Sequence, residues 1–250
     1  MLLKEWNTIN QILLEIYSIR RLDELTERLF KMFNVLVPYS QGYFIVFEEH
    51  NRIDLSKSRF IHMNAESRKK YLEYFYEMDY LNYIFEFTVN TSTYRDTDIL
   101  EEEVRKNTDF YREFLQPQNI PYGCGIVLLK KRKMIGIINL FRSREMGNFS
   151  DRDMVLLDIL KLHLENILVN LTEGERAYQD EKLNGFAKRY RLSLREQEVM
   201  ALMKKGFSNI EMERLLSISL STVKKHVFHI YGKTGVKSRT QLLALLHEEE

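Results

Sequence analysis

The chain contains few of the residues that cross-link or interrupt a fold. Its 250 residues include one cysteine, three prolines and ten glycines. A single cysteine, Cys124, excludes an internal disulfide, so a reducing cytoplasm is the expected compartment. The scarcity of proline and glycine favours a compact chain rich in helices and strands.

Long apolar runs and catalytic motifs are also lacking. No uninterrupted run approaches the roughly 18 apolar residues of a transmembrane helix, so we expect no membrane span. Lys4, Glu5 and Asn7 interrupt the apolar N-terminal stretch, as is typical of an amphipathic helix rather than a signal peptide. The sequence holds no nucleophile–base set, phosphate-binding loop or metal-ligand cluster, and we therefore expect no enzyme, cofactor or metal site.

The net charge of +1 conceals a division along the chain. Residues 188–247 hold twelve Lys and Arg against four Asp and Glu, a net charge of +8. The remainder holds 25 basic and 32 acidic residues, a net charge of −7. A basic end on an acidic body indicates a polyanionic partner for that end, although a solvated charged surface would give the same counts.

The first 170 residues combine helical and strand patterns. Apolar residues recurring every three or four positions predict helix over 4–35, and 66–85 and 98–115 are also expected to be helical. Strands are predicted at 42–48 and, more weakly, 58–64, with an antiparallel hairpin at 122–131 and 133–143. Ser150, followed by Asp153, predicts the start of a long helix, and the polar stretch 172–182 predicts a linker.

This order of elements, ending in NLFRS…FSDRDMVLLDILKLHLENIL, resembles a GAF sensor domain over about residues 5–170. The resemblance implies an α+β domain with an antiparallel sheet and helices, which senses a small molecule or a partner protein. A PAS-type sensor fits the same pattern. A phospho-receiver domain is not expected, because such a domain opens with a strand that ends in paired acids, and this chain opens with a helix.

Aromatic side chains concentrate in this first domain, and aromatic-lined pockets bind small ligands. A plain aromatic core would give the same pattern. Asp79 is similar to the ligand-binding Asp of autoinducer-binding regulators, but the tryptophans of that family are absent, so no acyl-homoserine lactone is inferred. Cys124, between two glycines, is expected to be buried rather than redox-active. The candidate ligand-binding residues are Tyr43, Phe60, His62, Tyr74, Tyr80, Tyr83 and Tyr111.

The C-terminal residues predict four short helices. Ser193 with Glu196, and Ser208 with Glu211, each fit a capping box, in which a serine and a glutamate three positions later satisfy backbone N–H groups reciprocally. Gly206 ends the first helix, and Ser219 or Ser221 caps the third. The tight turn between the second and third helices predicts a helix-turn-helix.

The same region closely resembles the LuxR/GerE-type helix-turn-helix at fixed spacing over about 50 residues. The matching features are REQEV, Gly206, Ser208–Asn209, Glu211, LLSIS, STVKKH, KTGV and Arg239. Four residues depart from the family pattern: Met212, Glu213, Thr234 and Gly232, which lies inside the recognition helix. We expect these departures to affect the stability of the unit more than its function. The resemblance implies an all-α, four-helix domain that binds double-stranded DNA.

The third helix of this unit must pack by one face and present another to the major groove. Val223, Val227 and Ile230 recur at i, i+4 and i+7 and form the predicted inner stripe. The predicted base-reading residues, which the family resemblance also implies, are Lys224, Lys225 and Phe228. The residues expected to contact phosphates or position the helix are Ser208, Asn209, Ser221, Thr222, His226, Lys237 and Arg239.

The two histidines of this helix leave alternatives open. His226 fits either a half-buried, satisfied side chain or a contact to phosphate or base. A metal held by His226 and His229 is disfavoured, because no third ligand lies nearby in sequence and a zinc site needs three or four.

These observations predict a cytoplasmic bacterial transcriptional regulator that is not an enzyme. We expect a sensor and dimerisation domain at 1–170, a linker at 171–187 and a DNA-binding domain at 188–250. The expected partners are double-stranded DNA, a second copy of the chain, and a small-molecule effector or RNA polymerase. Leu242, Leu243, Leu246 and the helices flanking the linker are candidate dimer contacts. The alternative is a protein-interaction module that modulates another regulator and binds DNA weakly or non-specifically.

Overall fold

The computed structural model describes residues 3–48, 52–81 and 87–248. The chain forms two compact units, Met1–Thr172 and Glu173–Glu250, each with its own apolar core. The first unit is α+β and the second is helical, as expected. No helix in the described part of the chain is long and apolar enough to cross a membrane.

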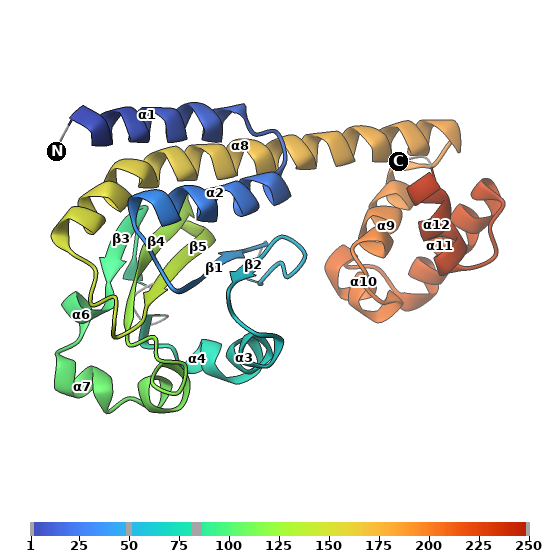
Figure 1. Ribbon diagram of the computed structural model, residues 1–250. Coiled ribbons are helices and arrows are strands. Elements are labelled where there is room, and N and C mark those ends of the chain that lie inside the picture. The colour runs from blue at the N-terminus through green and yellow to red at the C-terminus, as the bar shows by residue number, and fades with distance from the viewer. Residues whose placement is uncertain (1–2, 49–51, 82–86, 249–250) are drawn as a thin grey trace. The chain divides into compact units, whose positions relative to one another are not determined.

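A five-stranded antiparallel sheet organises the first unit (Figure 1). Its strand order is β2-β1-β5-β4-β3. The strands are β1 (Gln41–Val46), β2 (Arg59–Ile61), β3 (Ser92–Arg95), β4 (Tyr122–Lys130) and β5 (Lys133–Arg142). The predicted hairpin is β4–β5, and its turn residues Lys131 and Arg132 have φ angles of 49° and 64°, as a two-residue hairpin turn requires. The edge strand β3 was not predicted, because its short sequence STYR shows no apolar alternation.

The two faces of the sheet carry different layers (Figure 1). Helices α1 (Leu3–Ser18), α2 (Leu22–Leu36) and the first part of α8 (Asp151–Arg189) pack on one face with Phe44, Cys124 and Leu140. Cys124 is fully buried there, as predicted, and burial raises the pKa of its thiol. The opposite face carries Tyr43, Val127 and Phe141. Alternate residues of each strand thus serve opposite cores.

Short segments cover the second face of the sheet. They are α3 (Ala65–Lys70), the π-helical η2 (Tyr71–Phe75), α4 (Tyr76–Met78), α6 (Asp96–Ile99), α7 (Glu102–Lys106) and the π-helical η3 (Phe110–Leu115). The single helix expected at 98–115 is therefore wrong, and the described part of 66–85 is broken as well. Both stretches turn irregular where tyrosine and phenylalanine side chains point into the second core. The predicted helix at 4–35 is likewise two helices, α1 and α2.

Helix α8 begins at the predicted cap. Ser150 Oγ accepts a hydrogen bond from the Asp153 N–H at 3.3 Å, and Asp153 Oδ2 accepts one from the Ser150 N–H at 2.8 Å. Asp153 also pairs with Arg142 at 2.9 Å, which ties the helix start to β5. The helix continues to Arg189, so the expected linker 171–187 lies within α8. The predicted domain boundaries stay predictions.

The second unit consists of the end of α8 followed by α9 (Leu194–Lys204), α10 (Asn209–Leu216), α11 (Leu220–Thr234) and α12 (Arg239–Glu248). Its core joins Phe186 of α8 to Val199, Met212, Val223 and Leu242. Leu242 and Leu246 are buried in this core at 0% and 7% exposure. The expectation that Leu242 and Leu246 are dimer contacts is corrected, because both side chains are buried inside the unit and are not available on its surface.

Candidate nucleic-acid interface and effector site

Helix α11 packs by the predicted inner stripe. Val223 and Ile230 are fully buried, and Val227 is half-buried against the same core. Thr234 completes the stripe one turn further on, where its hydroxyl donates to the carbonyl of Ile230 at 2.8 Å. One face of the helix is therefore fixed to α9 and α10, and the other face is left for a partner.

The beginning of α11 is fixed by a serine. Ser219, rather than Ser221, is the N-cap, and its hydroxyl accepts a hydrogen bond from the Thr222 N–H at 3.2 Å. The hydroxyls of Ser221 and Thr222 both lie 2.8 Å from the Ser219 hydroxyl. Three hydroxyl groups thus meet at the start of the helix, where the Leu220 N–H is bonded to Glu213 Oε1 at 3.0 Å and the Thr222 N–H to Ser219. The hydroxyls are therefore the groups here that are suited to a phosphate.

The outer face of α11 carries the predicted base-reading side chains. Lys224 and Lys225 are exposed, and Phe228 is 74% exposed, which is unusual for a phenylalanine. Ser221, Lys225, Phe228 and Gly232 follow one another at spacings of four, three and four, so they form a single line opposite the buried stripe. Basic, apolar and hydroxyl groups in one exposed line suit the donor, acceptor and methyl pattern of a major groove.

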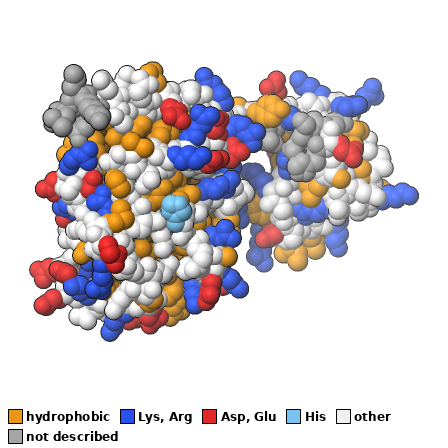
Figure 2. All heavy atoms as spheres, viewed as in Figure 1, with side chains coloured by type: hydrophobic (Ala, Val, Ile, Leu, Met, Phe, Trp, Pro, Cys, Tyr) orange, Lys and Arg blue, Asp and Glu red, His pale blue; other side chains and the backbone are white. Residues whose placement is uncertain are grey.

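The remaining positioning residues occupy varied environments. Ser208 caps α10 through the predicted capping box with Glu211, and Asn209 begins that helix half-exposed. His226 is half-buried, and Lys237 is exposed just before α12. Figure 2 shows Lys and Arg side chains on the surface of this unit. These placements leave the predicted phosphate contacts of Ser208, Asn209, His226 and Lys237 as predictions.

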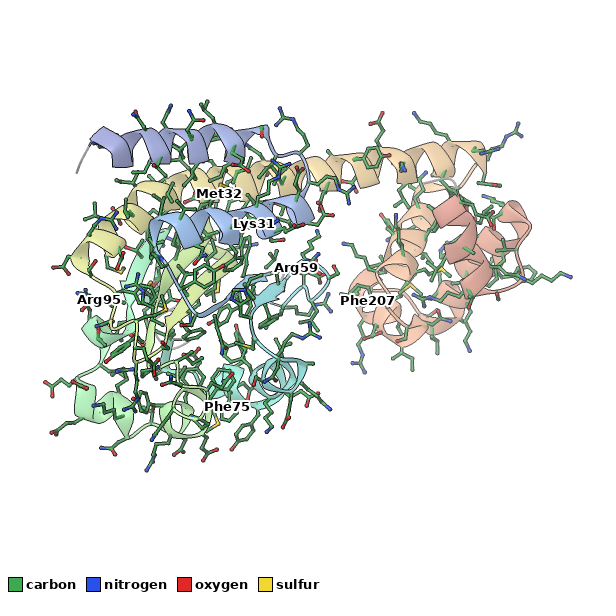
Figure 3. The ribbon with its side chains drawn as sticks, viewed as in Figure 1. Lys31, Met32, Arg59, Phe75, Arg95 and Phe207 are labelled. Atoms are coloured by element: carbon green, nitrogen blue, oxygen red, sulfur yellow. The ribbon has the colours of Figure 1, made fainter. Side chains whose placement is uncertain are left out.

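Arg239 serves the interior of the unit instead. Its guanidinium donates to the carbonyl of Phe207 at 2.7 Å and to that of Met203 at 2.6 Å. These bonds satisfy carbonyls at the end of α9 and anchor the start of α12 to it. Phe207, labelled in Figure 3, packs against the same core. The structure therefore favours a role for Arg239 in holding the helices together over direct phosphate contact.

The first unit gathers only part of the predicted ligand-binding set. Tyr43 and Tyr111 are buried in the second core, with Phe60 and Tyr80 packed against it. Tyr74 is 56% exposed, and its ring contacts that of Phe75 at a centroid distance of 5.0 Å. His62 stacks on Tyr39, whose side chain belongs to the opposite core, and bonds to the Ser40 carbonyl at 3.0 Å. Tyr83 lies outside the described residues.

A chain of polar groups runs through the aromatic side chains of this core. Asn139 Nδ2 donates to Tyr43 Oη at 3.2 Å, Tyr43 Oη lies 2.9 Å from Tyr71 Oη, and Tyr71 Oη lies 3.0 Å from Asp79 Oδ2. Because each hydroxyl carries one proton, Tyr71 donates to the carboxylate when Tyr43 donates to Tyr71. The chain thus ends on Asp79, whose other oxygen accepts from the Leu81 N–H at 2.9 Å.

Asp79 is a buried carboxylate to which the described residues bring no cation. Its residue is 2% exposed, and among the described residues no Lys, Arg or His pairs with it. Burial raises the pKa of Asp79 to about 7, against the lowering effect of the Leu81 N–H and the Tyr71 hydroxyl. At the other end of this hydrogen-bonded series, Asn139 Oδ1 is buried with no hydrogen-bond partner in the described structure. Both ends of the series, Asn139 and Asp79, therefore offer hydrogen-bond acceptors.

A second buried acid lies beside the first. Asp96 Oδ2 accepts from the Gly123 N–H at 3.0 Å and from the Tyr80 hydroxyl at 3.1 Å, and Arg105 approaches it at 3.5 Å. Arg105 is 1% exposed, donates to the Pro121 carbonyl and lies 5.0 Å above the Tyr111 ring. Burial raises the pKa of Asp96 to about 6, although Arg105 opposes this.

Sequence reasoning missed most of this network. Asp96, Arg105 and Asn139 were not singled out, Tyr71 was noted as one of the clustered aromatic residues but not as a candidate ligand-binding residue, and Asp79 was noted only for its family resemblance. The rings around the network include Phe75, labelled in Figure 3, with Phe110 and Phe114 at centroid distances of 6.3 Å and 5.0 Å. One signal was available: Asn139 interrupts an otherwise apolar run, IGIINLF, on a strand that is buried on both faces.

Comparisons with known proteins identify relatives of the second unit and of most of the chain. Residues 190–246 match the family model described as bacterial regulatory proteins, luxR family. The monoamine regulon transcriptional regulator of Klebsiella aerogenes is 25% identical over 225 residues, 90% of this chain and 91% of that protein. The putative HTH-type transcriptional regulator YhjB of Escherichia coli K12 is 41% identical over 56 residues, 22% of this chain and 28% of that protein.

Two solved structures are similar more distantly. SdiA of Escherichia coli gives a TM-score of 0.47 at 18% identity and covers 96% of this chain and 95% of its own. The GAF domain of the cyanobacteriochrome TePixJ gives 0.48 at 11% identity and covers 63% of this chain and 94% of its own. Residues 190–246 are thus a LuxR-family helix-turn-helix, and over most of its length the chain is similar to a transcriptional regulator. The matched families are regulatory proteins rather than enzymes.

Proposed function

We propose that this chain is a sequence-specific DNA-binding regulator, acts as a homodimer in the cytoplasm, and responds to a small effector bound in its first unit. The outer face of α11 carries the DNA part of the proposal. Lys225 and Phe228 are exposed on this face, and neither side chain belongs to the apolar core of the unit. Lysine donates to guanine O6 and N7, and a phenyl ring contacts a thymine methyl.

Selection from random-sequence DNA followed by affinity measurement tests this part. We expect an enriched motif and binding that weakens steeply with salt. Lys225→Ala should cost about 1–3 kcal/mol on the selected site and relax its preference at one base position. Lys237→Ala should instead weaken binding to all sequences alike, and Lys69→Ala, an exposed lysine of the first unit, should change neither.

The alternative, a protein-interaction module, predicts a different outcome. No motif would be enriched, and Lys225→Ala would cause a small loss that is the same for every sequence. The exposed line of α11 supports sequence-specific DNA binding. A helix that contacts only phosphates gains nothing from an apolar side chain, and Phe228 at the centre of the line is 74% exposed.

For the effector, we propose a small molecule that carries an N–H or ammonium group. Asp79 and Asn139 Oδ1 both present acceptors, and within the described ranges no cation pairs with the carboxylate. Aromatic rings around a carboxylate favour a positively charged guest, through their negative faces. The relative from Klebsiella aerogenes is named for a monoamine regulon, which makes a monoamine the first probe to try.

Tyramine and 4-ethylphenol form a matched pair for this test, because they differ only in the amino group. We expect tyramine to raise the midpoint of thermal unfolding in a concentration-dependent way and 4-ethylphenol to raise it less. Tyr71→Phe should weaken the response, and Asp79→Asn should remove the difference between the two compounds. Equal shifts for both compounds with the unchanged chain would contradict the role of the carboxylate.

A further inference from the structure

The turn between β4 and β5 concentrates positive charge on the first unit. It consists of Lys130, Lys131, Arg132 and Lys133, and the last three of these side chains are exposed. Without these four residues, residues 1–172 hold 19 basic and 25 acidic side chains, a net charge of −6. The turn is thus a local basic cluster on an acidic unit, and such a cluster is the electrostatic signature of a contact with a polyanion.

The exposed cations of the turn are not neutralised by the unit itself. Among the described residues, Lys131, Arg132 and Lys133 form no ion pair. Elsewhere in the unit an exposed lysine commonly pairs with a glutamate one helical turn away, as Lys31 does with Glu27 at 2.7 Å. Neighbouring like charges repel one another, so this part of the surface gains from an anion that comes from outside.

The backbone of the turn makes these residues an unfavourable choice for folding. Lys131 and Arg132 lie in the left-handed region, with φ angles of 49° and 64°. Two-residue turns of this kind favour Asn-Gly, because a longer side chain is strained at positive φ. The charges do not protect a sheet edge either, since β4 and β5 are both inner strands. Neither turn stability nor edge protection therefore explains the basic residues.

Two contacts within the first unit fix the direction in which the hairpin points. At the end of β5, Arg142 pairs with Asp153 in the first turn of α8 at 2.9 Å. Near the start of β5, a Cβ added to Gly136 would lie 3.1 Å from Leu168 Cδ2. Strand and helix therefore run in opposite directions, and the intervals agree, with about 20 Å of strand against about 22 Å of helix. The turn before β5 thus points the way in which α8 leaves the first unit.

We propose that the β4–β5 turn is a second DNA contact, which binds phosphates beside the sequence that α11 reads. Helix α8 continues past Leu168, and the chain then enters the DNA-binding helices. Lysine brings a point charge to a phosphate, and the guanidinium of Arg132 can donate two parallel hydrogen bonds. Such contacts add affinity without reading sequence. The proposal rests on the DNA binding of the proposed function, but not on its sequence specificity.

A turn built from the preferred residues tests the proposal in the full chain. Lys131→Asn with Arg132→Gly removes two charges and relieves the backbone, so the thermal midpoint should rise by about 2–4 °C. Arg68→Ala with Lys69→Ala, which removes two exposed cations of α3, is the matched control. Affinity is measured for a duplex that ends at the selected motif and for one extended on each side by two helical turns, about 20 base pairs.

The turn variant should lose affinity for the extended duplex only. Losing two phosphate contacts should reduce the slope of log affinity against log salt by about 1.8, so the loss should be about tenfold larger at about 50 mM than at about 200 mM salt. The α3 control should match the unchanged chain on both duplexes. Lys131→Gln with Arg132→Gln removes the charges without changing to the preferred turn residues, and it should show the same loss.

Two results would overturn the proposal. One is equal affinity of the turn variant and the unchanged chain for the extended duplex at low salt, even if the turn binds another anion such as a phosphatidylglycerol vesicle. The other is an equal loss on both duplexes, because the short duplex has no flanking phosphates. A chain that selects no motif, but whose turn variant still loses salt-dependent affinity for long DNA, refutes the sequence specificity of the proposed function and retains the turn contact.

Discussion

Two buried carboxylates, one in each unit, experience opposite surroundings. Glu196 of α9 is 4% exposed, and Asp79 of the first unit is 2% exposed. Glu196 accepts from Lys233 Nζ at 2.5 Å and from the Ser193 N–H at 2.7 Å, with His229 at 3.6 Å. Burial alone would raise the pKa of Glu196, but these partners outweigh it and the pKa is lowered. The partners of Asp79 in the described part of the chain are all uncharged, and its pKa is raised.

The contrast separates structural from functional groups. Glu196 closes a capping box and joins α9 to α11, so its burial is compensated and contributes to the stability of the unit. Asp79 costs folding free energy when ionised, and the Leu81 N–H and the Tyr71 hydroxyl offset only part of that cost. A buried charge that the fold compensates only in part is a candidate for binding, because a ligand can supply the missing partner. Asp96, held by Arg105, lies between the two cases.

The largest expected effect comes from turning Asp96 into a second uncompensated acid. Arg105→Ala leaves Asp96 buried without its cation and removes the contact to the Pro121 carbonyl. We expect the first unit to lose about 3–5 kcal/mol of unfolding free energy, measured by urea denaturation. Arg112→Ala, which breaks an exposed pair with Asp109, is the control and should cost less than about 1 kcal/mol. Similar losses for both variants would show that Asp96 needs no compensation.

A smaller and pH-dependent effect is expected from Asp79→Asn. The folded pKa of about 7 exceeds the unfolded value of 3.8, so the folded state binds the proton more tightly. The unchanged protein therefore loses stability as pH rises from about 4 to about 7, and the variant lacks this loss. Between pH 5 and pH 8 the variant should gain about 1–3 kcal/mol relative to the unchanged chain.

Urea denaturation at several pH values measures this difference. Asp109→Asn, at an exposed position, should run parallel to the unchanged chain across the range. Parallel curves for Asp79→Asn as well would mean that Asp79 is compensated after all, and the contrast with Glu196 would no longer hold.

The contrast also explains how far sequence alone reached. The capping boxes of Glu196 and Glu211 and the inner stripe of α11 were predicted correctly, because caps and helical periods depend on residues a few positions apart. The network that ends on Asp79 joins residues 43, 71, 79 and 139, which meet only through strand register and the packing of η2. No local pattern encodes such a meeting. The same limit applies to Arg239, whose carbonyl partners lie more than thirty residues away.

Gly232 extends the comparison to the backbone and carries the smallest expected effect. It lies inside α11 on the exposed line with Lys225 and Phe228, and a Cβ added there would meet nothing within 4 Å. A glycine in a helix interior costs about 0.5–1 kcal/mol relative to alanine, and no contact within the unit offsets this cost. Like Asp79, it carries a free-energy cost that its surroundings do not fully offset.

We therefore expect Gly232→Ala to raise the unfolding free energy of the second unit by about 0.5–1 kcal/mol, measured by urea denaturation. Gly174→Ala, at another open helical position but on α8, is the matched control and should stabilise by a similar amount. Their effects on DNA should differ. If Gly232 lets the DNA backbone approach α11 closely, Gly232→Ala weakens DNA binding while Gly174→Ala leaves it unchanged. Unchanged DNA binding in both variants would show that Gly232 does not contact DNA. The DNA contact of α11 would then be confined to the turns that carry Lys224, Lys225 and Phe228.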